Sequence, residues 1–182
     1  MSSVVAKDPV VIASRAPDLR VMRLFNPVIR ALLRSPFHGL LSGQILLLTY
    51  TGRKSGRRYT LPVGFIRDAD ALLVVSQHSE LKHWWRNLRD GAPVTLLLGG
   101  QQVSARADLI ENPEAVAAEV QRLIARLGAK EASRQLYMDL DVAPPPTHEQ
   151  LAQALHGVVV VRITPSARDA MKETEYVKQP AQ

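Results

Sequence analysis

A short loop between two apolar runs carries four basic side chains within six residues. The stretch from 46 to 65 reads LLLTYTGRKSGRRYTLPVGF, and Arg53, Lys54, Arg57 and Arg58 stand around its two glycines. Glycine lets the backbone turn and lets a ligand approach it closely. Exposed backbone N–H groups beside Arg and Lys suit an anion such as phosphate or carboxylate. For the loop alone, a solvated hairpin turn is the favoured interpretation, because surface charge is ordinary.

A second group of candidate residues follows the next apolar run. His78 and His83 stand five residues apart, and His78 could give a proton to a substrate anion after a hydride arrives. The favoured interpretation is that neither is catalytic: His78 is a polar loop residue and His83 lies on the surface of a helix. Their spacing lacks the carboxylates of a metalloprotease helix, so no metal site is expected. Hydrolysis has no support, because no serine has a nucleophile-elbow context.

The elements that must position these residues are strands joined in hairpins. Apolar runs at 44–51, 58–67, 71–76, 94–98, 102–110 and 158–163 predict about six strands. A helix is expected at 80–89, and Gly99-Gly100 makes a two-residue hairpin turn. Successive hairpins favour an antiparallel sheet or small barrel with packed helices, an α+β protein that is mainly β.

Further helices are predicted at 112–127, 130–138 and 147–155, and an amphipathic one at 18–37. The last of these mixes arginines with Leu, Phe and Ile, a composition that could bind an anionic membrane surface weakly. Packing on the barrel or at a dimer interface is the favoured interpretation. The expected organisation is a flexible tail at 1–17, a single domain at 18–164 and a polar tail at 165–182.

Composition narrows the class of protein. The chain has 182 residues, 46% of them hydrophobic and 22% charged, as in ordinary globular proteins. It has no cysteine, which excludes disulfides and a thiolate nucleophile and fits a cytoplasmic protein. Residues 1–60 hold ten Lys/Arg and two Asp/Glu, a net charge of +8, which suits an anionic ligand. The sequence has no zinc-finger, RNA-binding or helix-turn-helix pattern beside this positive charge, so no nucleic-acid partner is expected. No signal peptide or membrane-spanning run is recognised.

Three segments together resemble a known family. GQILLLTYTGRKSGRRYTLPV, LLVVS and HWWRNLRDGAPVTLLLGG, at this spacing, are similar to the deazaflavin-dependent nitroreductase family of flavin and deazaflavin oxidoreductases. The similarity covers roughly residues 24–110. The resemblance implies a split β-barrel of the FMN-binding type, commonly a homodimer. It also implies coenzyme F-420, a deazaflavin with a phosphate and an oligoglutamate tail, as cofactor, with FMN as the alternative.

The resemblance also implies site residues. The loop would bind the polar side chain of the cofactor, the following strand would lie along it, and the end of the third strand and the tryptophan segment would approach its ring. The expected cofactor-binding residues are Arg53, Lys54, Ser55, Arg58, Thr60, Pro62, Val75, Ser76, Gln77, Trp84 and Asn87.

The substrate side departs from the family pattern. Gln77-His78-Ser79-Glu80 stands where nitro-reducing relatives often have a Gly-rich stretch and a lysine, and the C-terminal region is poor in tyrosine. We therefore expect hydride transfer to a quinone or enone more readily than to a nitroaromatic. Tyr50, His78 and Tyr137 are the predicted catalytic residues bordering the acceptor. The alternative function is a non-catalytic split-barrel protein that binds or carries the cofactor. A peripheral position on the inner face of the membrane is a further expectation.

Overall fold

The computed structural model describes residues 19–143 and 145–166, which fall into two compact units. One unit runs from Glu111 to Val158 and is helical. The other holds the chain before and after it, Pro17–Ile110 and the segment from Val159, and contains every strand of the described chain. The predicted tails fall almost wholly outside the described residues. The single domain expected for 18–164 stays a prediction.

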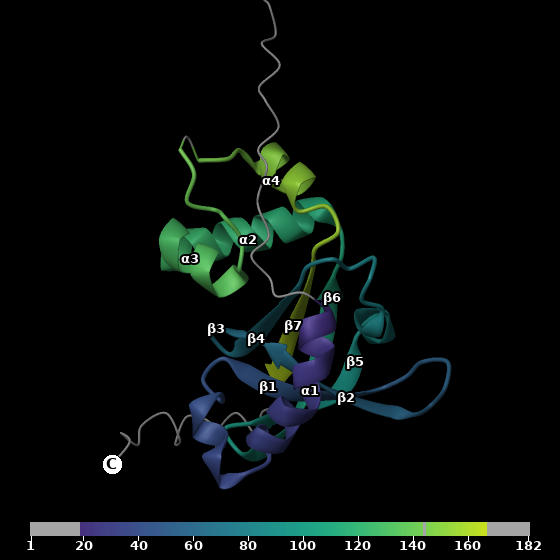
Figure 1. Ribbon diagram of the computed structural model, residues 1–182. Helices are drawn as coiled ribbons and strands as arrows, with labels where there is room; N and C mark the ends of the chain where they lie inside the picture. The colour runs from purple at the N-terminus through teal and green to yellow at the C-terminus, as the bar shows by residue number, and fades with distance from the viewer. Residues whose placement is uncertain (1–18, 144, 167–182) are drawn as a thin grey trace, which may run out of the picture. The chain divides into compact units, whose positions relative to one another are not determined.

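The sheet has seven strands, all paired antiparallel (Figure 1). Their bounds are β1 Ile45–Thr51, β2 Arg58–Gly64, β3 Ile66–Asp68, β4 Ala71–Ser76, β5 Ala92–Leu98, β6 Gln101–Ile110 and β7 Val159–Pro165. Their order across the sheet is β2-β1-β5-β6-β7-β4-β3. The sheet curls, and the predicted α+β fold of split-barrel type is confirmed.

One expected strand is divided. The sequence predicted a single strand over 58–67, but β2 ends at Gly64 and β3 begins at Ile66. Phe65 lies between them, and its backbone N–H donates to the carbonyl of Gln44, 3.0 Å away. The chain therefore leaves its pairing with β1 and continues in a hairpin with β4, which gives seven strands instead of about six.

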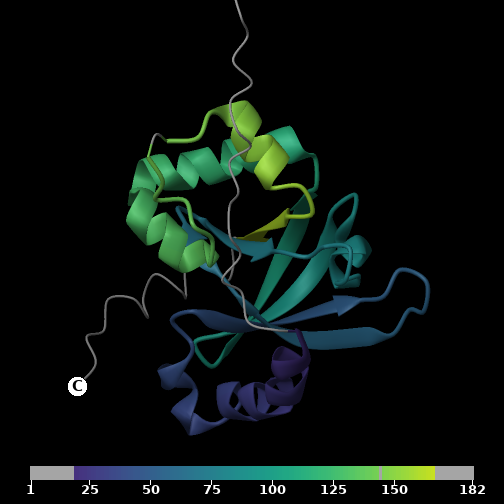
Figure 2. The ribbon, with the colours of Figure 1, turned by 45° about the horizontal axis from the view of Figure 1, so that its top comes forward.

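Short helices accompany the sheet. α1 (Leu19–Leu33) lies along β1 and β2 (Figure 2) and is followed by a 3-10 turn, η1 (Pro36–Leu40). The helix predicted at 18–37 ends at Leu33 and continues through Pro27. The helix expected at 80–89 is shorter, a 3-10 helix η2 at Trp84–Leu88 that begins after a turn at His78. None of the described helices is both long and apolar enough to cross a bilayer.

Caps and one histidine organise the helical unit. It contains α2 (Pro113–Leu127), α3 (Ala129–Leu136) and α4 (His148–Ala154). The Asn112 side chain caps α2, and Thr147 forms a capping box with Gln150 at α4. The His148 ring links α4 to α2, with Nε2 2.9 Å from Glu114 Oε2.

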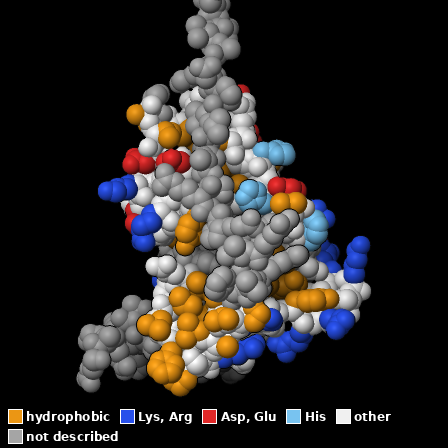
Figure 3. All heavy atoms as spheres, in the orientation of Figure 1, with side chains coloured by type: hydrophobic (Ala, Val, Ile, Leu, Met, Phe, Trp, Pro, Cys, Tyr) orange, Lys and Arg blue, Asp and Glu red, His pale blue; other side chains and the backbone are white. Residues whose placement is uncertain are grey.

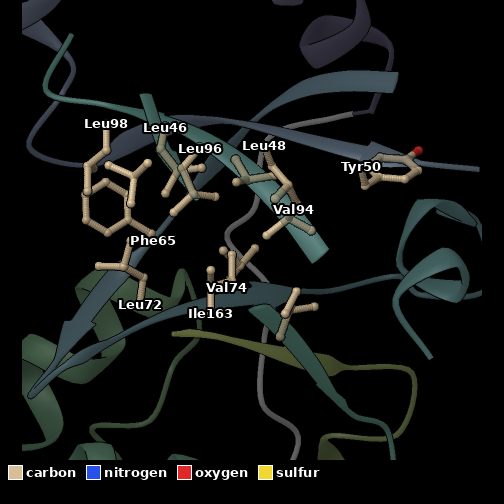
Figure 4. Close-up of a cluster of buried hydrophobic side chains, with 14 of the residues drawn as sticks. Leu46, Leu48, Tyr50, Phe65, Leu72, Val74, Val94, Leu96, Leu98 and Ile163 are labelled. Carbon is tan, nitrogen blue, oxygen red and sulfur yellow. The ribbon is translucent and has the colours of Figure 1, made fainter. Parts of the chain in front are cut away.

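The sheet unit buries one apolar cluster on its inner face (Figure 4). Alternate residues of each strand contribute to it, because successive side chains of a strand point to opposite faces. The cluster includes Leu46, Leu48 and Tyr50 of β1, Leu72 and Val74 of β4, Val94, Leu96 and Leu98 of β5, and Val161 and Ile163 of β7. This alternation fixes which residues at the strand ends face inward.

Candidate functional site

Strand directions bring the candidate residues to one end of the sheet. Thr51 at the end of β1 pairs with Arg58 at the start of β2, and β5 begins beside the same end of β1. Following the antiparallel pairs onward, β6 ends, β7 begins and β4 ends there, with Ser76 opposite Val159. We call this end, where Thr51, Arg58, Ser76 and Ala92 lie, the mouth. The loop 52–57, the segment 77–83 and η2 all leave the sheet at the mouth.

The basic loop is a tight, hydrogen-bonded turn. The backbone N–H of Gly52 donates to the carbonyl of Arg57, and that of Gly56 donates to the carbonyl of Gly52, both at 2.8 Å. Gly56 has φ 65°, a conformation that glycine adopts without steric cost. Ser55 Oγ accepts from the backbone of Arg57 and bonds to the Tyr59 hydroxyl, both at 3.3 Å. Arg53, Lys54, Arg57 and Arg58 are exposed on this turn, as the predicted anion site requires.

One loop cation is already engaged. The backbone N–H of Arg53 donates to Asn87 Oδ1 at 3.0 Å, and its guanidinium reaches Asp90 at 3.0 Å and the carbonyl of Arg89 at 3.4 Å. The Asn87 amide in turn donates to the carbonyl of Trp84 at 2.9 Å. The structure thus brings Arg53 and Asn87 together, as parts of a contact between the loop and η2.

The remaining loop cations have no such partner. Lys54, Arg57 and Arg58 make no ion pair with any described residue. In Figure 3, Lys and Arg side chains gather on the right of the sheet unit, the side on which Figure 1 shows the β1–β2 loop. These three side chains could therefore bind an anion without first breaking an ion pair with a carboxylate.

An aromatic cluster stands behind the loop. The rings of Tyr50 and Tyr59 stack with centroids 5.7 Å apart, and Trp84 packs against Tyr50 at 6.4 Å with a tilt of 42°. Burial raises the pKa of Tyr50, and the neighbouring Tyr59 raises it further. The Tyr50 phenol is therefore neutral at physiological pH. Tyr59 was not among the predicted site residues, although its place directly after the basic loop was a usable signal.

Gly52 sits against this cluster, which makes it sensitive to substitution. A Cβ at position 52 would lie 2.7 Å from Ser55 Oγ and 2.8 Å from a carbon of the Tyr59 ring. We expect Gly52→Ala to displace both side chains and to lower the free energy of unfolding by about 1–2 kcal/mol. Gly43→Ala is the matched control, because nothing lies within 4 Å of its added Cβ. It should be neutral or slightly stabilising. Urea unfolding of both variants checks this, and equal midpoints would contradict the packing described.

The end of β4 supplies a buried polar pair at the mouth. Ser76 and Gln77 are both buried, and Ser76 Oγ has no hydrogen-bond partner among the described residues. Buried hydroxyls without a partner are uncommon in folded proteins. Val75 is half-buried and points to the opposite face from Val74 and Ser76.

His78 and Tyr137, two predicted catalytic residues, occupy exposed positions. His78 has φ 54°, and its ring lies 3.9 Å from the Glu80 carboxylate with both side chains open to solvent. Tyr137 ends α3 with φ 53° and is 51% exposed. It belongs to the helical unit. Of the three predicted catalytic side chains, Tyr50 is the buried one at the mouth.

Thr60 and Pro62 of β2 lie on the face opposite the core, since they alternate with Leu61 and Val63. Thr60 Oγ1 is 2.9 Å from Thr49 Oγ1, and its carbonyl accepts a hydrogen bond from Arg30 Nη2 at 2.5 Å. The Arg30 Nε atom is buried and has no partner among the described residues. Arg30 was missed from sequence because its contact spans thirty residues.

The segment 77–83 and the start of η2 hold Lys82 and the two tryptophans, which differ in burial. Lys82 is half-buried, its side chain has no ion pair or hydrogen bond in the described structure, and burial lowers the pKa of its ammonium group. Trp85 is buried and donates from Nε1 to the carbonyl of Ser79 at 3.1 Å. Trp84 is only partly buried and faces Tyr50, so it is the tryptophan available to a ligand at the mouth.

Several solved structures are distantly similar to this chain. An F420-H2 dependent reductase is 20% identical, with 65% of this chain and 93% of that chain covered and a TM-score of 0.34. An F420 reductase is 14% identical, with 76% of this chain and 93% of that chain covered and a TM-score of 0.37. The haem storage protein HutZ from Vibrio cholerae is 15% identical, with 73% of this chain and 90% of that chain covered and a TM-score of 0.40. No curated protein matches the chain.

The family match is broader. The model of the F420H(2)-dependent quinone reductase family matches residues 22–143, which include the basic loop, the end of β4 and η2. This is well over half of the chain, and the predicted relationship to deazaflavin-dependent reductases is confirmed. The chain belongs to the F420H(2)-dependent quinone reductase family.

Proposed function

We propose that this protein is a reductase that binds reduced coenzyme F-420 at the mouth and passes a hydride to a quinone or enone. Family membership supports a reductase. The observation that carries the proposal is the juxtaposition of exposed, unpaired loop cations with an aromatic cluster at the same end of the sheet.

The residues present fit such a cofactor. A phosphate and an oligoglutamate tail need several cations, and Lys54, Arg57 and Arg58 supply them without breaking an ion pair. A planar ring needs an apolar slot with a few polar contacts. The buried, unpartnered hydroxyl of Ser76 and the partly buried Trp84 ring are the candidate contacts. FMN, which also carries a phosphate, is the alternative occupant.

Once bound, the deazaflavin supplies the hydride chemistry itself. The chain contributes position and environment. Trp84 and Tyr50 cover the inner side of the mouth, and the contact of Arg53 with Asn87 holds the loop beside η2. Proximity and orientation of this kind can lower a barrier by several kcal/mol.

The acceptor is the finer part of the proposal. We favour a quinone or enone over a nitroaromatic because Gln77, His78, Ser79 and Glu80 follow β4 in place of a Gly-rich stretch with a lysine. The homodimer and the weak membrane-surface association expected from the sequence likewise stay predictions.

A panel of acceptors tests the substrate class. Stopped-flow oxidation of reduced coenzyme F-420 is measured with menadione, cyclohexenone and a nitroimidazole at matched concentrations. We expect menadione or cyclohexenone to react fastest. A nitroimidazole that reacts fastest would overturn the acceptor assignment. Tight binding of the cofactor without turnover of any acceptor would favour the carrier alternative.

A further inference from the structure

Two hydroxyl groups end the inner face of the sheet at the mouth. On β1, Leu46 and Leu48 belong to the buried cluster and Tyr50 is the next inward residue. On β4, Leu72 and Val74 belong to it, and Ser76 is the next inward position by the same alternation. Because β1 and β4 both end at the mouth, the inward rows of both strands finish there in a hydroxyl group.

Neither hydroxyl has a partner among the described residues. Tyr50 is 8% exposed and Ser76 4% exposed. Ser76 Oγ is a buried atom without a partner, whereas the Tyr50 oxygen is not fully buried and makes no hydrogen bond to a described residue. Figure 4 shows the Tyr50 oxygen directed away from the buried leucines. The Tyr50 ring is thus buried while its hydroxyl reaches the surface at the mouth. A hydroxyl that reaches the surface of the mouth, on a buried ring and without a partner among the described residues, is available to bond to a ligand atom.

The surroundings of Tyr50 fix where that ligand atom would lie. Stacking against Tyr59 and contact with Trp84 hold the phenol ring from two sides. The hydroxyl therefore has little freedom, and a group held in place for one partner is an effective donor. Because the tyrosine stays protonated at physiological pH, its hydroxyl can donate a hydrogen bond to a ligand oxygen.

We propose that the Tyr50 hydroxyl binds the carbonyl oxygen of the quinone or enone and gives it a proton during reduction. This assignment rests on the proposed function. A hydride that reaches the conjugated acceptor brings two electrons, and the carbonyl oxygen then gains negative charge. The O–H bond of Tyr50 breaks as a new O–H bond forms on the acceptor. Solvent returns a proton to the tyrosinate, so atoms and charge balance.

The test compares Tyr50→Phe with Thr164→Val. The first removes only the hydroxyl and keeps the ring that packs on Tyr59. The second removes a hydroxyl from an exposed, outward position of β7. The first measurement is quenching of tryptophan fluorescence in the cofactor-free protein, titrated with menadione and with 2-methylnaphthalene, which has the same ring shape and no carbonyl.

We expect Tyr50→Phe to raise the Kd of menadione about 5- to 10-fold and to leave that of 2-methylnaphthalene unchanged. Thr164→Val should alter neither. In turnover with reduced coenzyme F-420, Tyr50→Phe should lower kcat for menadione about 100-fold with the KM for the cofactor unchanged, as loss of a general acid predicts.

Equal menadione affinities in wild type and Tyr50→Phe would overturn the assignment. The same loss of affinity for both probes would also overturn it, because that pattern reports lost packing. The binding arm needs neither cofactor nor turnover. Wild-type protein that binds menadione through Tyr50 but oxidises no cofactor would refute the proposed function, not the contact.

Discussion

Replacing Lys54 and Arg58 together by alanine is expected to weaken binding of coenzyme F-420 by about 3 kcal/mol, more than a hundredfold in Kd. Both side chains are exposed on the β1–β2 loop and make no ion pair with a described residue. Each charge-assisted hydrogen bond to a phosphate or carboxylate contributes about 1.5 kcal/mol or more. Isothermal titration calorimetry at low salt measures the change, and added salt should weaken wild-type binding as well.

The matched control removes two positive charges elsewhere. Arg34, directly after α1, and Lys130 on α3 are both exposed, and Arg34→Ala with Lys130→Ala makes the same change in net charge. Cofactor affinity should stay within about a factor of two in this variant. A similar loss in both double variants would mean that net charge, and not the loop, governs binding. No loss in the loop variant would remove the anion site from the account.

The ion pair of Arg53 adds a finer expectation to the same experiment. Its guanidinium already contacts Asp90, so a ligand anion would have to compete with that carboxylate. Arg53→Ala should therefore cost less binding energy than Lys54→Ala or Arg58→Ala. From sequence alone the loop cations were indistinguishable.

Leu96→Ala is expected to lower the free energy of unfolding by about 2–5 kcal/mol. Leu96 is 0% exposed and stands in the middle of β5, opposite Leu48 of β1 and Val103 of β6. Shortening it leaves a cavity in the cluster on which the inner face of the sheet is built. Urea unfolding followed by circular dichroism measures the loss.

Leu40→Ala supplies the control for that substitution. Leu40 is 78% exposed in η1, so the same chemical change should alter stability by less than about 0.5 kcal/mol. Equal destabilisation by the two variants would mean that Leu96 does not occupy the packed interior described.

The hairpins could be read from the sequence because their signals are local. Alternating apolar residues on both sides of Gly52–Arg58 and the Gly99-Gly100 turn each predict two paired strands. The break at Phe65 was not predicted in this way, since the alternation of Tyr59, Leu61, Val63 and Phe65 continues across it and indicates one strand. It depends on a backbone hydrogen bond to Gln44, which only the folded chain brings near.

The site was predictable in type and less so in detail. The basic loop, the end of β4 and the tryptophan segment were identified by resemblance, and strand directions place all three at the mouth. The contact of Arg53 with Asn87 spans thirty-four residues of chain, so no local pattern reports it. The unpartnered hydroxyl of Tyr50 was equally hidden, because a missing hydrogen bond is a property of the folded surroundings.

The most direct test of the central claim is anaerobic turnover with a choice of cofactor. The protein is mixed with menadione and either reduced coenzyme F-420 or reduced FMN, and oxidation of each cofactor is followed by absorbance against a protein-free control. The account predicts that the protein accelerates oxidation of reduced coenzyme F-420, with one cofactor consumed for each quinone reduced, and does so far more than for reduced FMN. Acceleration with reduced FMN alone, or with neither cofactor, would contradict it.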